Sequence, residues 1–313
     1  MRVNSKVLAG AMLCLLAVPE AALAWGPATH VGLARGILDT VSLLPIGVGV
    51  LLARHAAAYV FGNIAADIVF AKRLSRIKQF CHHWSTGFRL LDQARNDQGR
   101  AFAYGYLSHL AADTVAHGKY VPRQITVSGC SPRFGHLYWE LRADAVVDEA
   151  HWQHLESVLG HDHAYHHATL EELITDTFLS YELNRMVFNR MHALAVRRTF
   201  RNTLTILGRC SRWYLSDALM NGYREECVQR IRSVLAEGPR SPFVREDPNG
   251  TSALMQLRVR RREHRRLRRQ GIPLLHRTRE LSQALGPWPA TALPVCGQTT
   301  PPIAEPLAPV CPA

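Results

Sequence analysis

Histidines and carboxylates recur every four residues along two stretches of this sequence, and this spacing restricts the fold more than any other feature. In the first stretch, His109, Asp113 and His117 are each four residues apart. Steps of four residues on an α-helix bring side chains to one face, drifting by about 40° per step. The residues between them are mostly apolar, and an unpaired carboxylate is costly to bury there. The spacing therefore predicts a helix whose buried face carries metal-binding side chains.

The second stretch repeats the pattern with His136, Glu140 and Asp144. Two such stripes on adjacent helices can face each other and surround metal ions, as ligands do inside helical bundles. Solvated helix faces with ordinary charge pairs are the alternative, but two stripes flanked by apolar residues make that reading the weaker one. We expect the two stripes to share one metal centre.

Helical spacing of apolar residues covers most of the chain, whereas strand signals are scarce. A loop is predicted over 121–134, because Pro122, Gly129 and Pro132 interrupt the pattern there. A run rich in histidine over 161–167 is expected to be an exposed loop. The chain is therefore predicted to be all-α, as a multi-helix bundle. The predicted helices cover 29–53, 54–70, 101–119, 135–155, 170–196, 198–218, 223–236 and 252–285.

The first 24 residues have the features of a secretory signal peptide. Arg2 and Lys6 precede an uncharged apolar stretch, and Ala22-Leu23-Ala24 has the small-x-small pattern of a cleavage site. The apolar stretch is short for a membrane span, so a retained anchor is the weaker interpretation. We expect a periplasmic or secreted protein that begins at Trp25 and has no transmembrane segment after cleavage.

Composition divides the remaining chain into three parts. We expect a catalytic core over 25–155, a helical extension packed on it over 156–285, and a proline-rich tail over 286–313. Six cysteines remain once Cys14 is removed, and an even number in an exported protein suggests disulfides. No CxxC pair is present, which argues against a zinc site made of cysteines.

Further candidate ligands lie before the first stripe. Asp67 ends a strongly apolar stretch, and His30 follows shortly after Trp25. His82 and His83 are adjacent, so their side chains cannot point the same way and we expect at most one of them to bind metal.

Taken in order, these residues resemble the zinc-dependent phospholipase C family, and the related fungal single-strand-specific zinc nucleases share the order of ligands. The resemblance covers roughly 25–148. It implies an all-α fold that holds three zinc ions. One zinc would be held by Asp67, His109, Asp113 and either His83 or His82, with His83 preferred.

The resemblance implies that the second zinc is held by His30 and by the free amino group and carbonyl of Trp25, with Asp113 bridging to the first zinc. Such a role for Trp25 would explain why cleavage must follow Ala24. The expected nucleophile is a hydroxide shared by two zinc ions, since bound water has its pKa lowered to about 7. Asp67 and Asp113 are the expected catalytic residues, Asp67 as a general base if it contacts this water.

His117, His136 and Glu140 would hold the third zinc, with Asp144 as a substitute ligand or a supporting partner. His117 follows Asp113 by four residues, whereas the bacterial phospholipases C and the fungal nucleases have six. The shorter spacing is similar to the N-terminal domain of glycosylphosphatidylinositol-specific phospholipase D. The distance from Trp25 to His30 is instead that of the nucleases.

Charge favours a phosphate-bearing substrate, because the chain has a formal net charge of +12. The segment Arg258–Arg269 has eight arginines in twelve positions, which suits either a solvated helix or contact with an anionic membrane. The leading hypothesis is a zinc-dependent phosphodiesterase that hydrolyses phospholipids in the manner of phospholipase C. A single-strand-specific nuclease or nucleotidase with the same three zinc ions is the alternative. A non-catalytic module whose zinc only stabilises the fold is the third.

Overall fold

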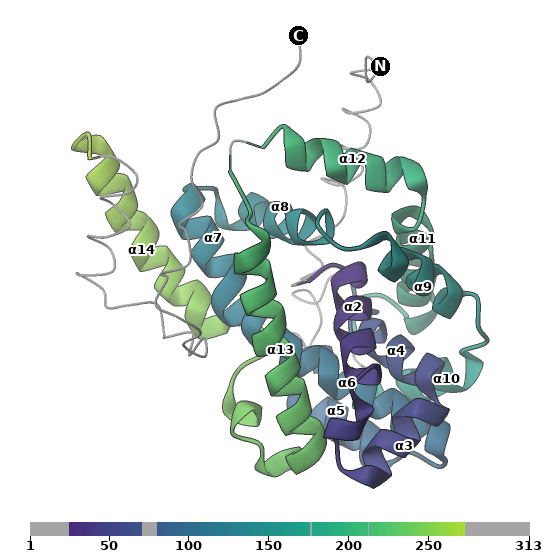
Figure 1. Ribbon diagram of the computed structural model, residues 1–313. Helices are drawn as coiled ribbons and strands as arrows, with labels where there is room; N and C mark the ends of the chain where they lie inside the picture. The colour runs from purple at the N-terminus through teal and green to yellow at the C-terminus, as the bar shows by residue number, and fades with distance from the viewer. Residues whose placement is uncertain (1–24, 71–79, 176, 212, 273–313) are drawn as a thin grey trace.

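The computed structural model describes residues 25–70, 80–175, 177–211 and 213–272. Within these residues every regular element is a helix, and none is a β-strand (Figure 1). The predicted all-α class is therefore confirmed. The α-helices are α2 (Pro27–Leu38), α3 (Ile46–Arg54), α4 (Ala56–Ala65), α5 (Trp84–Asp92), α6 (Asp97–Val115), α7 (Val121–Ser128), α8 (Pro132–Asp144), α9 (Glu149–Leu159), α10 (Ala164–Leu173), α11 (Tyr181–Ala195), α12 (Arg198–Arg209), α13 (Asp217–Glu237) and α14 (Thr251–Arg269). Short 3-10 turns are η1 (Val41–Leu43), η2 (Phe80–His82), η4 (Gly238–Arg240) and η5 (Pro242–Arg245), and η3 (Ala116–Tyr120) is a π-helix.

Helix α6 lies at the centre of the fold, with α4, α5, α13 and α2 packed around it. Two glycines allow α4 and α6 to approach closely. A Cβ added to Gly62 would lie 2.1 Å from the carbonyl oxygen of Phe102, and one added to Gly105 would lie 2.0 Å from that of Tyr59. Any larger residue at either position would push the helices apart. This close contact brings the backbone of α4 within reach of side chains on α6.

The second half of the chain packs directly on the first. Helix α13 runs along α6 and α2, and α14 lies against α7 and η3 at one edge of the molecule (Figure 1). The apolar core includes residues of both halves, from Trp25 on the N-terminal side to Leu257 in α14.

Several predicted boundaries are wrong. The predicted loop over 121–134 contains α7, because Pro122 falls in the first turn of that helix, where no backbone N–H is needed. Gly129, with φ of 67°, ends α7 in the left-handed conformation. Asn221 and Gly222 do not interrupt the helix but lie inside α13. The predicted helices over 29–53, 170–196 and 198–218 are each interrupted or shortened, at η1, between α10 and α11, and after Arg209.

The run over 161–167 is also not simply an exposed loop. It enters α10 at Ala164, and both His163 and His166 are buried. His166 stacks on Phe102 of α6, with 4.4 Å between ring centroids. Its imidazole therefore belongs to the core and not to the surface.

Three further predictions concern residues outside the described ranges. The signal peptide and the proline-rich tail both lie outside them, as does the part of the last predicted helix after 272. Within the described residues, Cys81, Cys130, Cys210 and Cys227 form no disulfide with one another, while Cys296 and Cys311 fall outside.

No single helix of the described part has the length and apolar character of a membrane span. Helices α3 and α4 meet both criteria only as a pair, and they are bent by 90°.

Candidate metal centre

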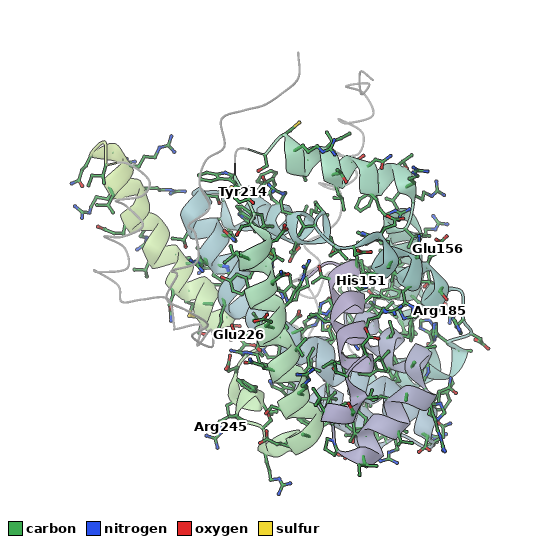
Figure 2. All side chains as sticks on the ribbon, in the orientation of Figure 1. His151, Glu156, Arg185, Tyr214, Glu226 and Arg245 are labelled. Carbon is green, nitrogen blue, oxygen red and sulfur yellow. The ribbon has the colours of Figure 1, made fainter. Side chains whose placement is uncertain are left out.

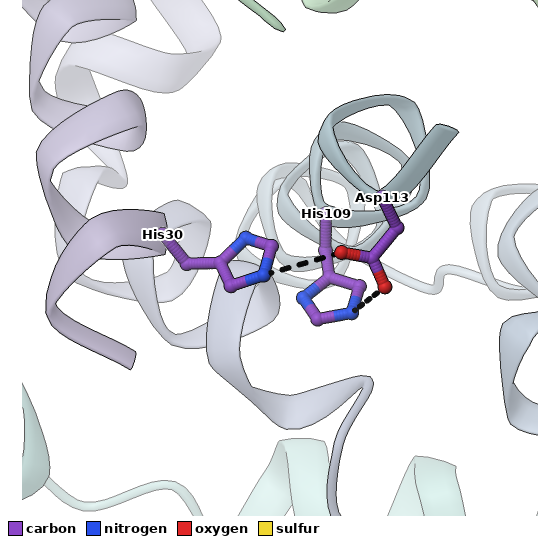
Figure 3. Close-up of side chains that lie close together, drawn as sticks. All are labelled: His30, His109 and Asp113. Atoms are coloured by element: carbon purple, nitrogen blue, oxygen red, sulfur yellow. Dashed lines mark ion pairs between the residues drawn. The ribbon is translucent and has the colours of Figure 1, made fainter. Parts of the chain in front are cut away.

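Two helices bring the first group of candidate ligands together. His109 and Asp113 point from α6 toward His30 on α2, as Figure 3 shows. The Nε2 atom of His30 lies 3.4 Å from Oδ1 of Asp113, and Nε2 of His109 lies 3.1 Å from Oδ2 of the same carboxylate. The His30 and His109 rings stack with 4.0 Å between their centroids. One ligand atom from each of the three residues fits within a sphere that suits a single cation.

A second group shares His109 with the first and adds Asp67 and His82. Asp67 follows the last turn of α4, and His82 ends η2. Nε2 of His82 lies 3.3 Å from Oδ1 of Asp67 and 3.2 Å from Oδ2 of Asp113. Asp113 therefore faces both groups, as the bridging role implied by the resemblance requires.

The orientation of His109 is set by a hydrogen bond on the far side of its ring. Its Nδ1 atom lies 2.7 Å from the carbonyl oxygen of Asn63 on α4. A donor at Nδ1 leaves Nε2 with a lone pair directed at the carboxylates, which is how metal-binding histidines are usually fixed. The close packing of α4 on α6 allows this hydrogen bond. No pattern in the sequence predicts it.

His117 and His136 lie at the other end of the stripe on α6. His117 belongs to the π-helix η3, a widened turn of a kind that is often found at functional sites. Its Nε2 atom lies 3.7 Å from Oδ2 of Asp113. The ring of His136 on α8 is perpendicular to it at 4.9 Å, and Nε2 of His136 lies 2.9 Å from Oε1 of Glu140. The three residues expected to hold a third zinc are therefore neighbours.

Asp144 has a different role from Glu140. Its carboxylate accepts hydrogen bonds from the backbone N–H and the hydroxyl of Thr29, at 3.0 Å and 2.6 Å, and from the N–H of Ala28 at 3.4 Å. It thereby satisfies the first turn of α2, the helix that carries His30. The structure therefore places Asp144 as a support for α2 and Glu140 in the candidate metal centre.

The structure favours His82 over His83 as the candidate ligand. The side chain of His82 is 1% exposed and faces the two carboxylates, whereas His83 is exposed and precedes the first turn of α5. The 3-10 turn η2 decides between them, because it directs His82 inward and ends just before His83. Hydropathy around the pair carries no signal for this choice.

Trp25 lies beside the first group. Its indole N–H donates to the carbonyl oxygen of Ala112, the neighbour of Asp113, at 3.3 Å. Its ring stacks on Tyr120 with 4.6 Å between centroids, and the residue is fully buried. These contacts hold the start of the described chain at the wall of the candidate metal centre.

The buried polar atoms of the cluster fit a divalent cation. Both oxygens of Asp113, both ring nitrogens of His30 and Nε2 of His117 are buried with no hydrogen-bond partner among the described residues. Such atoms are costly unless something compensates them. Imidazole nitrogens and carboxylate oxygens are the ligands that zinc takes in catalytic sites. The donor set therefore suits zinc.

Protonation agrees with this interpretation. Burial lowers the pKa of His30, and the adjacent His109 lowers it further. Burial also lowers the pKa of His117 to about 3. Burial alone would raise the pKa of Asp113, but the facing imidazoles, His109 first, hold it well below its usual range. At neutral pH His30 and His117 are therefore neutral and Asp113 is ionised, which are the forms that bind metal ions.

Access to the centre is uneven. His109 and Asp113 are fully buried, whereas the side chain of His136 is 21% exposed. Burial raises the pKa of Glu140 to about 8, against the lowering effect of His136. A cation at this end would favour the ionised form of Glu140 instead. Among the candidate histidines and carboxylates of the centre, His136 is the most exposed to solvent.

The all-helical fold surrounds a buried cluster of histidines and carboxylates that could hold metal ions. Residues 29–186, just over half of the chain, match the family model for zinc-dependent phospholipase C. The chain therefore belongs to the zinc-dependent phospholipase C family, which implies a hydrolase that uses zinc. No curated protein and no solved structure matches the chain significantly.

Proposed function

We propose that this protein is an exported phosphodiesterase that hydrolyses phospholipids with three zinc ions. The observation that carries the proposal is the position of Asp113, whose two oxygens face His30 on one side and His82 and His109 on the other. Membership of the zinc-dependent phospholipase C family supports the same reaction class.

Different residues of the chain would hold the three cations. Asp113 would bridge two cations, with His30 on one of them and Asp67, His82 and His109 on the other. His117, His136 and Glu140 would hold the third. Bound zinc supplies a water of lowered pKa and positive charge for the phosphoryl oxygens. Asp67, a member of the second group, would accept a proton from the attacking water.

Processing would complete the centre. Removal of residues 1–24 creates a free amino group at Trp25, whose indole is already anchored between Ala112 and Tyr120. We expect the mature protein to begin at Trp25 and to bind more zinc per chain than a form that retains the leader. N-terminal sequencing of the exported protein and metal analysis of both forms test this. Equal zinc content in the two forms would exclude Trp25 as a ligand.

Substrate class is tested by supplying alternative phosphodiesters to the zinc-loaded protein. We expect release of phosphorylated headgroup from phosphatidylcholine vesicles, with loss of activity in chelator and recovery with zinc. Degradation of single-stranded DNA without headgroup release would overturn the lipid assignment in favour of the nuclease alternative. Full zinc occupancy with neither activity would show that the metal only stabilises the fold.

Contact with an anionic membrane through Arg258–Arg269 is part of the proposal. Helix α14 packs through Leu257 and Leu267, and its arginine side chains at 258, 262, 265, 268 and 269 are exposed. Glu263 is the only acidic residue in the helix, and it pairs with Arg266. An arginine near an anionic surface contributes about 1 kcal/mol of attraction.

Replacement of Arg262, Arg265 and Arg269 by glutamine tests this contact. Three lost charges amount to about 3 kcal/mol, or roughly 100-fold weaker binding to phosphatidylglycerol vesicles. Cosedimentation with vesicles measures the effect, and it should diminish as salt is raised.

The matched control removes three exposed arginines from the opposite half of the molecule, Arg185, Arg190 and Arg197. This variant has the same net charge as the α14 variant. Equal loss of vesicle binding by the two variants would show that net charge alone, and not α14, directs the protein to membranes.

A further inference from the structure

We propose that the turn over 246–250, which joins η5 to α14, is a positioning element of the metal centre, and that Asn249 is the positioning residue for His82. The inference rests on the zinc centre of the proposed function. The turn lies outside the residues 29–186 that match the family. It therefore assigns a role at the centre to a part of the chain that the family model does not cover.

Asn249 fixes the backbone on which His82 is mounted. Its side-chain amide donates to the carbonyl oxygen of His82 at 3.1 Å, and the residue is 8% exposed. On the other side of η2, the hydroxyl of Tyr106 donates to the carbonyl oxygen of Cys81. The backbone of η2 is thus held from α6 and from the second half of the chain, and the direction of the His82 ring depends on both contacts.

Gly250 packs on the second ligand-bearing segment. Its backbone lies so close to His117 that an added Cβ would be 2.4 Å from the carbonyl oxygen of His117 and 2.8 Å from its Cβ. Gly250 also has φ of 61°, a conformation that other residues adopt at a cost. The position therefore requires glycine for two reasons. The turn contacts His82 through one residue and His117 through the next.

Hydrogen bonds hold the turn at both of its ends. The carboxylate of Asp247 accepts hydrogen bonds from the backbone N–H groups of Asn249 and Thr251, each at 2.8 Å. The indole N–H of Trp84 donates to the carbonyl oxygen of Glu246 at 2.8 Å. Both ends of the turn are therefore fixed by hydrogen bonds within the described residues.

An ion network around the buried Arg230 connects the turn to α13 and to the end of α6. Arg230 on α13 donates to Thr114 at 2.7 Å and to Glu246 at 2.5 Å, and it pairs with Glu226 at 2.8 Å. Lys119 of the π-helix also contacts Glu226, which Figure 2 labels on α13. Arg230 is 3% exposed, and its direct contacts link the turn to the segment next to His117.

Zinc release provides the test. Residues that orient metal ligands from outside the coordination sphere typically change metal affinity by about 10- to 100-fold. We expect Asn249→Ala and the isosteric Asn249→Asp, which lacks the amide donor, to release zinc to a chromogenic chelator about 10- to 100-fold faster than the unaltered chain. The visible spectrum of the cobalt-substituted protein should also change, because the geometry around His82 changes.

The control is Ser180→Ala, which removes the hydroxyl that caps α11 away from the centre. It should lower stability by an ordinary capping loss and leave both zinc release and the cobalt spectrum unchanged. If Asn249→Ala does not fold, Asn249→Asp supplies the measurement. Gly250→Ala should accelerate release as well, by displacing His117.

The outcomes separate this inference from the proposed function. Rapid zinc release with an altered cobalt spectrum in the Asn249 variants, and not in Ser180→Ala, supports it. Zinc uptake by all variants with unchanged release and spectra would overturn the positioning role while leaving the zinc enzyme intact. A chain that takes up no zinc in its unaltered form would overturn both.

Discussion

Nε2 of His30 on α2 lies 3.4 Å from Oδ1 of Asp113 on α6, while the other oxygen of Asp113 lies 3.1 Å from Nε2 of His109. Each oxygen of the carboxylate is thus turned toward a different group of imidazoles, and neither has a hydrogen-bond partner among the described residues. This arrangement suits a carboxylate that joins two cations. Removal of its charge should therefore affect more than one metal ion.

Asp113→Asn tests this consequence. The amide keeps the shape of the side chain but loses the negative charge and places N–H donors where cations would bind. We expect zinc per chain to fall by at least one ion and phosphodiester hydrolysis to fall by more than about 100-fold, beyond the loss typical of residues that only support ligands. Plasma emission spectrometry and a headgroup-release assay measure the two effects.

Asp97→Asn is the matched control, since Asp97 lies on the same helix at an exposed position beside Arg100. It should keep full zinc content and activity. Full zinc content in Asp113→Asn itself would contradict the bridging role.

Removal of zinc should lower stability strongly. A ligand present at 1,000 times its dissociation constant stabilises the folded state by about 4 kcal/mol, and each kcal/mol moves Tm by about 2–4 °C in a protein of this size class. We expect a chelator to lower Tm by roughly 10 °C, because the buried imidazoles and carboxylates of His30, Asp113 and His117 lose their compensation.

Scanning calorimetry with and without chelator measures this shift, and excess zinc should reverse it. The Asp113→Asn variant should respond less to chelator than the unaltered chain. A chelator that leaves Tm unchanged would show that metal does not contribute to the folded state.

Local patterns in the sequence were sufficient to predict the helical class and the stripe of His109, Asp113 and His117. Both depend on the periodicity of the α-helix, which the sequence displays directly. Even here the structure adds a π-helix at His117, which spacing by fours does not indicate. The loop predicted over 121–134 failed because Pro122 is compatible with the first turn of a helix.

Contacts between distant segments could not be predicted. Glu140 and Asp144 look equivalent along α8, and only the hydrogen bonds from Thr29 distinguish them. Nothing in the sequence around Asn249 indicates that its side chain contacts the carbonyl oxygen of His82. Choices of this kind are made by tertiary packing, and a single sequence does not record the partners.

The choice between His82 and His83 can be checked by paired substitution. His82→Ala removes a buried imidazole that lies 3.3 Å from Asp67 and 3.2 Å from Asp113, so we expect loss of one zinc per chain and of hydrolysis. His83→Ala changes an exposed side chain and should keep zinc content and activity within about twofold, since surface substitutions usually have small effects. The reverse result would place His83 in the centre. Metal analysis of the two variants decides the question.

The buried His166 should make the protein sensitive to acid independently of the metal centre. Burial, together with smaller effects of His163 and His167, lowers the pKa of His166 to about 4. In the unfolded chain its pKa is about 6.5, so at pH 5 the unfolded state binds a proton that the folded state does not. The stability contributed by the neutral form is complete above pH 6.5 and is lost as pH falls toward 4. Between pH 7.5 and pH 5 the loss is about 2 kcal/mol.

His166→Phe separates this effect from every other titrating group. Phenylalanine retains the stacking on Phe102, which lies 4.4 Å away between ring centroids, but it cannot bind a proton. The free energy of unfolding in urea, measured on zinc-free protein at pH 7.5 and pH 5, should fall by about 2 kcal/mol less in the variant than in the unaltered chain. All other histidines are common to both proteins, so their contributions cancel. Equal falls in the two proteins would mean that His166 is protonated in the folded state and does not carry the acid sensitivity.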